Sequence, residues 1–485
     1  MQGNAEYLGA VIGLDDDAMC DWLHAELMSV SPVQRAIADP DFPVLLAFRM
    51  AKSNVLSAPT YLNRTLPYRV SATPLAEFDQ RLRCTLLGRL DLPDPLPAPA
   101  FISLTQPGRN GGLGLRLRSC IAPAAKWASA AIGAPDVAVF AALRPRLPFV
   151  ADRESCHALL VCAGVRVSDA PDEVEEQDAK GNSCPTFTLP ANPSDIATHY
   201  HERPRIRCLQ RSFTRQIEDR ALSSFISSSD CLPVDRARLR CCSSAAGQPA
   251  VNAWFSAAAA SSLEDPHVRV AIRLRLGLPP LPSPPSASTR CPLCHFDFQD
   301  DAWHAFSCQS LKSLSVTSRH DKIANLLINS FNSNLCLART VKKAFGHKLP
   351  DVEVHFPRET IFIDVSGTHP FNYSYLEGTL TNLFSALSNR ATTKSNKYSA
   401  WASERNARFV PFVLDSFGRL HKEASDLIKL AFTECSGRVP SPNCQSTQSL
   451  LTELSIQWQR SNGEIVSQWA IMCRDVLSCS SHSSS

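Results

Sequence analysis

Four residues that can bind metal lie close together in the chain and limit how this segment can fold. They are Cys291, Cys294, His304 and Cys308, in the spacing Cys-x2-Cys-x9-His-x3-Cys. The first two cysteines can form a tight turn that directs both thiolates at one ion, and His304 and Cys308 share one face of a helical turn. Three thiolates and one imidazole suit a tetrahedral Zn²⁺ ion. A segment this short has little apolar core, so the metal is expected to hold its fold.

The remaining cysteines favour a reducing compartment. The chain has 18 cysteines, scattered without regular spacing over most of its length. Residues 1–8 show no secretory signal, and the longest uncharged stretch, residues 241–263, is too polar to cross a membrane. We therefore expect an intracellular protein in which clustered Cys and His residues bind metal.

Composition excludes two broad classes of protein. Of the 485 residues, 44% are hydrophobic and 20% are charged, and the net charge is +3. A wholly disordered chain and a protein that binds nucleic acid by bulk charge are both excluded. Nucleic-acid binding would require local patches. Arginines cluster at Arg203, Arg205, Arg207, Arg211, Arg215 and Arg220, followed by Arg236, Arg238 and Arg240. This cluster is compatible with phosphate binding and equally with the solvated face of two helices.

The chain divides into segments of different character. We predict a helical region at 1–165, an acidic linker at 166–200 and a helical, arginine-rich region at 201–289 that ends in a Pro/Ser linker. The metal-binding segment spans 290–310. An α/β domain at 315–435 and a helix with a disordered Ser-rich tail at 436–485 follow.

A second group of residues suggests phosphodiester chemistry. Asp351 and Asp364 are expected on two adjacent strands, and Asp364 lies in an apolar, β-branched run that predicts a buried strand. A buried carboxylate is costly unless it is paired or bound to metal. Lys394 and Lys397 follow on one face of a predicted helix. Carboxylates can hold Mg²⁺, and a lysine can orient water or neutralise developing charge. Alternatively, Asp351 caps a turn and Asp364 forms a structural ion pair.

These residues resemble a known family. Pro350-Asp351, Asp364 and Lys394/Lys397 are similar to the PD-(D/E)xK restriction-like endonuclease of site-specific non-LTR retrotransposons, in which the lysine is displaced onto a following helix. A zinc knuckle precedes the nuclease in that family, as the segment at 290–310 does here. Arg319-His320 also resembles the family, although Asp321 stands where Asn is usual. Weaker similarities suggest a thumb-like region at 1–165, while no polymerase palm is recognisable.

The resemblance implies a multidomain α+β fold: a mostly helical N-terminal two-thirds, a small CCHC zinc knuckle and a C-terminal α/β nuclease core with a mixed sheet. It implies a Mg²⁺-dependent DNA endonuclease that nicks target DNA, with Asp351 and Asp364 as metal ligands and Lys394 or Lys397 beside the water. DNA and the element's RNA would be its partners, in the nucleus, and reverse transcription is not expected. The residues expected to bind nucleic acid are Arg203, Arg205, Arg207, Arg211, Arg273, Arg275, Arg319 and His320.

Two other hypotheses remain open. One is an inactive retroelement remnant that binds nucleic acid through its zinc knuckle. The other is an unrelated helical scaffold with a structural zinc ion. A separation of more than about 8 Å between the Asp351 and Asp364 carboxylates would favour the scaffold, because one cation could not bridge them.

Overall fold

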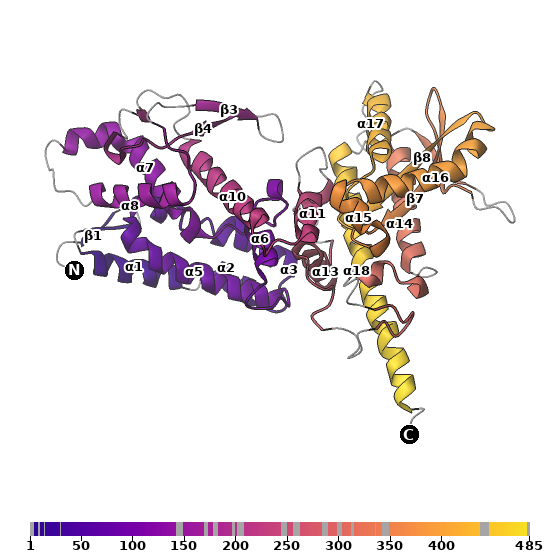
Figure 1. Cartoon of the computed structure of the whole chain (residues 1–485), viewed down its shortest axis with the longest axis horizontal. Coiled ribbons are helices and arrows are strands. Elements are labelled where there is room, and N and C mark those ends of the chain that lie inside the picture. Colours follow the sequence, from indigo (N-terminus) through magenta and orange to yellow (C-terminus); the bar gives the residue numbers. More distant parts are fainter. Residues whose placement is uncertain are drawn as a thin grey trace. The chain divides into compact units, whose positions relative to one another are not determined.

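The structure, a computed structural model, consists of two compact units that are described separately. It describes residues 4–7, 10–13, 15–29, 31–141, 149–168, 173–177, 183–195, 199–200, 208–243, 250–255, 262–283, 290–297, 303–311, 315–334, 336–341, 349–436 and 446–482. Unit 1 is Met1–Cys231 and unit 2 is Leu232–Ser485. Helices predominate in both (Figure 1). No helix among the described residues is long and apolar enough to span a membrane.

Unit 1 is built mainly from helices. They are α1 (Asp16–Met28), α2 (Pro32–Ala38), α3 (Val44–Met50), α4 (Thr60–Thr65), α5 (Tyr68–Arg89), α6 (Ala98–Thr105), α7 (Arg118–Ala141), α8 (Phe149–Cys162) and α10 (Leu209–Ser227), with the short turns η1 (Ala51–Val55), η2 (Gly108–Asn110) and η3 (Pro193–Asp195). Prolines lie in the first turns of α2 and α6, where the missing N–H of proline costs no helical hydrogen bond, so they fix where these helices begin.

A buried carboxylate joins two of these helices. Asp79 of α5 accepts hydrogen bonds from the backbone N–H groups of Arg118 (2.9 Å) and Ser119 (2.8 Å) and from the Ser119 hydroxyl (2.7 Å). It thus satisfies donors at the N-terminus of α7 that the helix itself cannot pair. Burial raises the pKa of Asp79. The central core beside it contains Trp127 and Phe213, both fully buried.

The acidic segment predicted as a linker contains secondary structure. Strands β3 (Glu173–Gln177) and β4 (Ser183–Phe187) form an antiparallel hairpin, and β1 (Asn4–Tyr7) and β2 (Ala10–Gly13) form another. Phe187, Leu189 and Tyr200 pack in the same core as Trp127. The segment predicted as an acidic linker therefore contains a β-hairpin, and the C-terminal end of this hairpin packs in the core of unit 1.

Unit 2 contains a four-stranded mixed sheet. Its strands are β5 (Leu337–Thr340), β6 (Val352–His355), β7 (Thr360–Thr368) and β8 (Ala407–Asp415), in the spatial order β5-β6-β7-β8. The first three strands pair antiparallel, while β7 and β8 are parallel. A parallel pair needs a crossover, which α15 (Tyr373–Thr381) and α16 (Ser385–Ser403) supply. This agrees with the predicted α+β class.

The two faces of the sheet are covered by different helices. Alternate residues of β7 such as Ile361 and Ile363 pack with α14 (Thr317–Ser333), α17 (Lys422–Ser436) and α18 (Thr447–His482). Phe362 points to the other face, where it packs with Tyr398 of α16. Asp364 is two positions further along β7, so it also faces α16. Figure 1 shows α16 alongside β7 and β8.

The remaining elements of unit 2 surround the long helix α18. They are α11 (Pro233–Cys242), α12 (Ala250–Ala253), α13 (Asp265–Leu276), η6 (His304–Phe306) and η7 (Gln309–Leu311). Helix α18 packs against α12, α13, α14 and η6, and its Trp458 and Trp469 are buried. The helix extends to His482, so most of the Ser-rich end expected to be disordered is helical.

Candidate metal centre and carboxylate site

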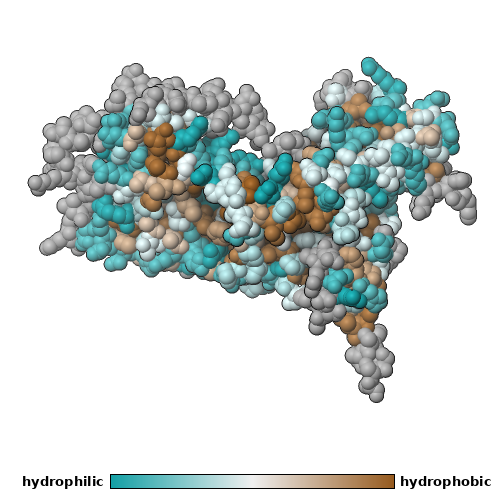
Figure 2. Space-filling view, viewed as in Figure 1, coloured by the Kyte–Doolittle hydropathy of each residue, from teal (hydrophilic) through white to brown (hydrophobic). Residues whose placement is uncertain are grey.

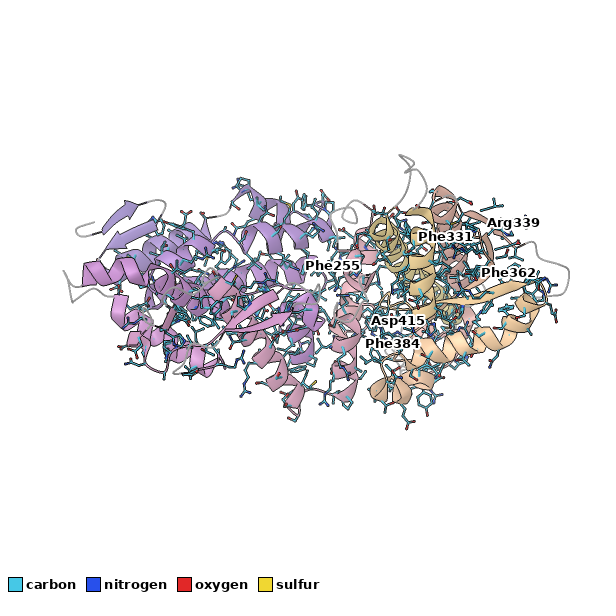
Figure 3. The ribbon with its side chains drawn as sticks, turned by 90° about the horizontal axis from the view of Figure 1, so that it is seen from above. Phe255, Phe331, Arg339, Phe362, Phe384 and Asp415 are labelled. Atoms are coloured by element: carbon cyan, nitrogen blue, oxygen red, sulfur yellow. The ribbon has the colours of Figure 1, made fainter. Side chains whose placement is uncertain are left out.

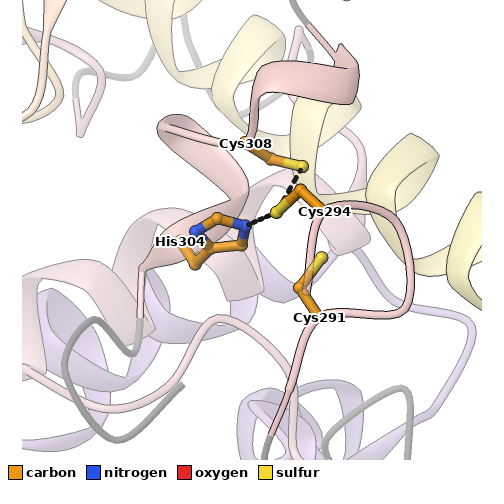
Figure 4. A group of neighbouring side chains, drawn as sticks. All are labelled: Cys291, Cys294, His304 and Cys308. Atoms are coloured by element: carbon orange, nitrogen blue, oxygen red, sulfur yellow. Dashed lines mark hydrogen bonds between the residues drawn. The ribbon is translucent and has the colours of Figure 1, made fainter. Parts of the chain in front are cut away.

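The four predicted metal ligands converge in unit 2. The ligand atoms of Cys291, Cys294, His304 and Cys308 all lie within 4.8 Å of one another (Figure 4). The Cys294 Sγ atom is 3.0 Å from His304 Nε2 and 3.8 Å from Cys308 Sγ. Such a group can hold a metal ion such as zinc.

The local backbone explains how the first two thiols meet. The N–H of His295 donates to the carbonyl of Cys291 (2.8 Å), and the N–H of Cys291 donates to the carbonyl of Phe296 (2.8 Å). This tight turn places His295 in the left-handed region, at a φ of 61°. The Phe296 ring stacks on the His304 ring with a centroid separation of 4.8 Å. The turn thereby directs both cysteines inward and the aromatic ring fixes the imidazole.

Helix α18 contributes a fourth thiol that sequence reasoning missed. Hydrogen bonding from Cys308 and Cys473 lowers the pKa of Cys291, and the same contacts raise the pKa of Cys308 and Cys473. Cys473 and Trp469 are buried in the same apolar cluster as the ligands. No spacing in the sequence links Cys473 to the metal-binding segment, since the contact is made by a distant helix.

The two predicted aspartates come together at the start of β6. The backbone N–H of Asp351 donates to the carbonyl of Ile363 (2.8 Å), and the Asp351 carboxylate accepts a hydrogen bond from the N–H of Val365 (2.7 Å). Asp351 is thus bonded to the residues immediately before and after Asp364. Burial raises the pKa of Asp364, and the charge of Asp351 raises it further, against the opposing effects of Lys394 and His320.

The two lysines occupy different positions. The Nζ atom of Lys394, which is half-buried, forms an ion pair with Asp364 Oδ2 at 2.7 Å. The Nζ atom of Lys397, which is exposed, donates to the hydroxyl of Tyr398 at 2.6 Å. Burial raises the pKa of Tyr398, with a further contribution from the negative charge of Asp364. Lys394 is therefore the lysine in direct contact with an aspartate of the pair.

His320 joins this site from α14. Its Nε2 atom lies 2.7 Å from Asp351 Oδ2, and its Nδ1 atom lies 3.0 Å from Asp321 Oδ1. Burial alone would lower the pKa of His320, but the hydrogen bonds with Asp351 and Asp321 outweigh burial and raise it. We refer to Asp351, Asp364, Lys394 and His320 as the carboxylate site.

A small cavity of about 110 Å³ opens beside the carboxylate site. Lys394, His320, Arg319 and Arg390 line it. Arg390 was not predicted, although it lies one helical turn before Lys394 and therefore on the same face of α16. Arg319 is buried, lies over the Trp458 ring at 4.4 Å and donates to Asn462 Oδ1 (3.0 Å).

The other residues predicted to bind nucleic acid have varied positions. Arg203, Arg205 and Arg207 lie outside the described residues. Arg211 is exposed on α10 in unit 1. Arg273 and Arg275 are buried in α13 and donate to the carbonyls of Pro279 (2.6 Å) and Val251 (2.7 Å) respectively. Arg273 therefore connects α13 to the segment that follows it, and Arg275 connects α13 to α12.

Comparisons with known proteins do not identify the chain. No family model matches it, and no curated protein matches it. Function therefore has to be argued from the geometry of the two sites.

Proposed function

We propose that unit 2 is a Mg²⁺-dependent DNA endonuclease of the PD-(D/E)xK type, derived from a non-LTR retrotransposon protein. The observation that carries the proposal is the convergence of three residues: Asp351 immediately before β6, Asp364 in β7 and Lys394 in α16. A purely structural ion pair would need one carboxylate for one lysine. Here a second carboxylate, Asp351, lies beside Asp364, and His320 contacts Asp351 at 2.7 Å. The two carboxylates repel each other, and a divalent cation bound between them would offset that repulsion.

The donor set suits a hard divalent cation. Asp351 and Asp364 offer carboxylate oxygens, which Mg²⁺ prefers over nitrogen or sulfur. Both described contacts of the Asp351 side chain engage Oδ2. A bound Mg²⁺ would supply Lewis-acid stabilisation of the phosphate and lower the pKa of a water molecule.

The protein's own groups would position the reactants. The Lys394 ammonium beside Asp364 would orient the attacking water and offset negative charge that develops on the phosphate. His320 would fix the orientation of the Asp351 carboxylate through its Nε2 contact. Arg390 and Arg319 line the adjacent cavity, where they would face the phosphate oxygens. Water would form a new P–O bond as the P–O3′ bond breaks, and the 3′ oxygen would leave with a proton.

Nicking of supercoiled plasmid by the full chain tests the proposal. We expect Mg²⁺-dependent nicking that EDTA abolishes and that Asp364→Asn reduces by about 10²-fold or more. The matched control is Glu353→Gln, which removes a carboxylate from β6 whose partners are Arg339 and His355. Glu353→Gln should nick at close to the wild-type rate. Equal nicking by wild type and Asp364→Asn would refute the proposal.

The cysteine–histidine cluster supports a second candidate function, a zinc-dependent nucleic-acid-binding protein without cleavage activity. Its three thiols and imidazole suit a structural Zn²⁺ ion. A folded, zinc-loaded protein that retards DNA on a gel but never nicks it would favour this second function.

A further inference from the structure

Unit 1 contains a large cavity to which the carboxylate site makes no contribution. Its volume is about 600 Å³, within the range of ligand-binding pockets. Four segments form its wall: α4, the turn η2, the start of α7 and the first half of α10. The residues that line it are Arg64, Arg109, Arg116, Arg118, Ile121, Gln210, Arg211, Thr214, Arg215 and Glu218.

Positive charge dominates this cavity. Glu218 pairs with Arg109 (2.9 Å) and Arg116 (2.6 Å), and Asp219 pairs with Arg109 (2.9 Å). Of the described residues that line the cavity, six are arginines and one, Glu218, is a carboxylate. Burial lowers the pKa of Arg118, the charge of Asp79 opposes this effect, and the neighbouring Arg116 adds to it. Guanidinium groups that line one cavity repel one another, and a bound anion would offset this repulsion.

Two of the arginines are held at the wall by neutral groups. Arg64 donates through Nε (3.0 Å) and Nη2 (2.6 Å) to Gln210 Oε1, so its positive charge is not cancelled by that partner. Arg118 donates to the Thr60 hydroxyl at 3.4 Å. These hydrogen bonds fix the direction of the guanidinium groups and leave their charge available to a ligand.

The lining also indicates what kind of anion would bind. Arginine recognises phosphate through paired N–H donors, and several arginines in one cavity can contact more than one phosphate. None of the described residues that line the cavity is aromatic, so they offer no platform on which a base could stack. Recognition would therefore be directed at phosphates rather than at base identity.

We propose that this cavity binds a polyanion with two or more adjacent phosphate groups, supplied by the backbone of a single-stranded nucleic acid. The alternative source of the same chemistry is a free polyphosphate. The proposal stands apart from the endonuclease, since it concerns other residues in another unit. Two arginines of the sequence cluster, Arg211 and Arg215, line this cavity. The fold adds the other four, which are Arg64, Arg109, Arg116 and Arg118.

Binding measurements on the full chain test the proposal. The variant Arg64→Gln/Arg211→Gln removes two exposed cavity charges, and Arg166→Gln/Arg220→Gln removes two exposed arginines of unit 1 outside the cavity. The probes are a 20-residue oligodeoxythymidine, the same oligomer with an uncharged methylphosphonate backbone, and inorganic tripolyphosphate, all without divalent cations. Thermal unfolding shows whether each variant is folded.

We expect the cavity variant to bind oligodeoxythymidine about tenfold more weakly than the control variant. The slope of log affinity against log salt concentration should also become shallower, by about 0.7 for each phosphate that the variant no longer neutralises. The methylphosphonate oligomer should bind weakly to all proteins. Equal affinities of the two variants for both phosphate probes would overturn the proposal. A loss of tripolyphosphate binding without a loss of oligonucleotide binding would overturn the nucleic-acid source and identify a small polyphosphate instead.

Discussion

The Nζ atom of Lys394 lies 2.7 Å from Asp364 Oδ2, which brings α16 into direct contact with the central strand β7. The exposed Lys397 is directed at the Tyr398 hydroxyl instead. If Lys394 acts on the attacking water, Lys394→Ala should reduce the rate of plasmid nicking by about 10²–10³-fold. Lys394→Ala also removes a partner of Asp364, which affects stability. The nicking rate should therefore be normalised to the amount of folded protein, as measured by thermal unfolding.

Lys397→Ala is the matched control for this prediction. It removes an ammonium group one helical turn away on the same helix and should leave nicking within a few-fold of wild type. A larger loss of activity in Lys397→Ala than in Lys394→Ala would show that the ion pair with Asp364 has no role in the reaction.

A buried ion pair at the end of β8 should be essential for the stability of unit 2. The Arg419 Nε atom lies 2.6 Å from Asp415 Oδ2, and both residues are almost completely buried. Asp415 also accepts from the N–H groups of Phe417 (3.0 Å) and Arg419 (2.9 Å), and the Arg419 guanidinium lies 5.2 Å from the Phe384 ring centre. Figure 3 shows Asp415 and Phe384 in neighbouring positions.

Asp415→Ala would leave a buried arginine unpaired, so it should lower the free energy of unfolding by about 3–5 kcal/mol. Asp426→Ala is the control, since Asp426 pairs with Lys429 at 3.3 Å on an exposed surface. That pair should contribute less than about 1 kcal/mol. Urea unfolding measures both changes, and similar losses in the two variants would contradict the assignment.

Two glycines should respond in opposite ways to substitution by alanine. A Cβ atom at Gly367 would lie 2.7 Å from Arg319 Nη2 and 2.8 Å from the Trp458 ring, whereas one at Gly88 would have no atom within 4 Å. Gly367→Ala should therefore destabilise the protein by about 1–3 kcal/mol through overpacking. Gly88→Ala, within α5, should stabilise it by about 0.5–1 kcal/mol. Chemical denaturation of both variants checks the contrast.

Sequence patterns predicted the parts of the molecule whose geometry is local. The Cys-x2-Cys turn and the His304–Cys308 spacing need only short-range backbone geometry, and their ligand atoms do converge. The β-branched run at Asp364 predicted a buried strand, which is β7. The lysines could not be separated, because residues three apart on a helix share a face and only packing decides which one meets β7.

Long-range packing accounts for what the sequence did not predict. Nothing in its own composition indicated that α18 would supply Trp458 to the core beneath the sheet and Cys473 to the metal-binding cluster. Arg273 and Arg275 were expected to bind nucleic acid, whereas both side chains are buried and donate to backbone carbonyls. The hydrophobic side chains that remain visible on the face shown gather in limited areas (Figure 2).

The metal-binding cluster should carry about one zinc ion per chain, retained after extensive dialysis. Cys308→Ser should lose that zinc and lower the unfolding temperature, because the bound ion would hold a segment with a small core. Cys84→Ser, an exposed cysteine of unit 1, is the control and should retain the metal. Metal analysis together with the fluorescence of Trp303 and Trp469 follows both effects. Full zinc content in Cys308→Ser would exclude Cys308 as a ligand.

The stability of unit 2 should fall as the pH drops below about 6.5, through His369. Burial, together with a smaller contribution from the nearby Arg319, lowers the pKa of His369 to about 3. Its Nδ1 atom lies 2.7 Å from the Ser416 hydroxyl. Between pH 6.5 and 3 the unfolded chain takes up a proton at this residue that the folded chain does not. The contribution of neutral His369 to the free energy of unfolding is therefore fully present above pH 6.5. Below pH 6.5 this contribution declines by up to about 1.4 kcal/mol per pH unit.

The variant His369→Gln isolates this effect, since glutamine can keep a hydrogen bond to Ser416 without titrating. Urea unfolding at pH 7.5, 6.5 and 5.5 should show a smaller decrease in unfolding free energy for His369→Gln than for wild type. Protonation of the cysteine–histidine cluster affects both proteins equally and cancels in the difference. Parallel pH profiles for the two proteins would mean that His369 titrates alike in the folded and unfolded states, and that its burial among aromatic rings does not keep it neutral.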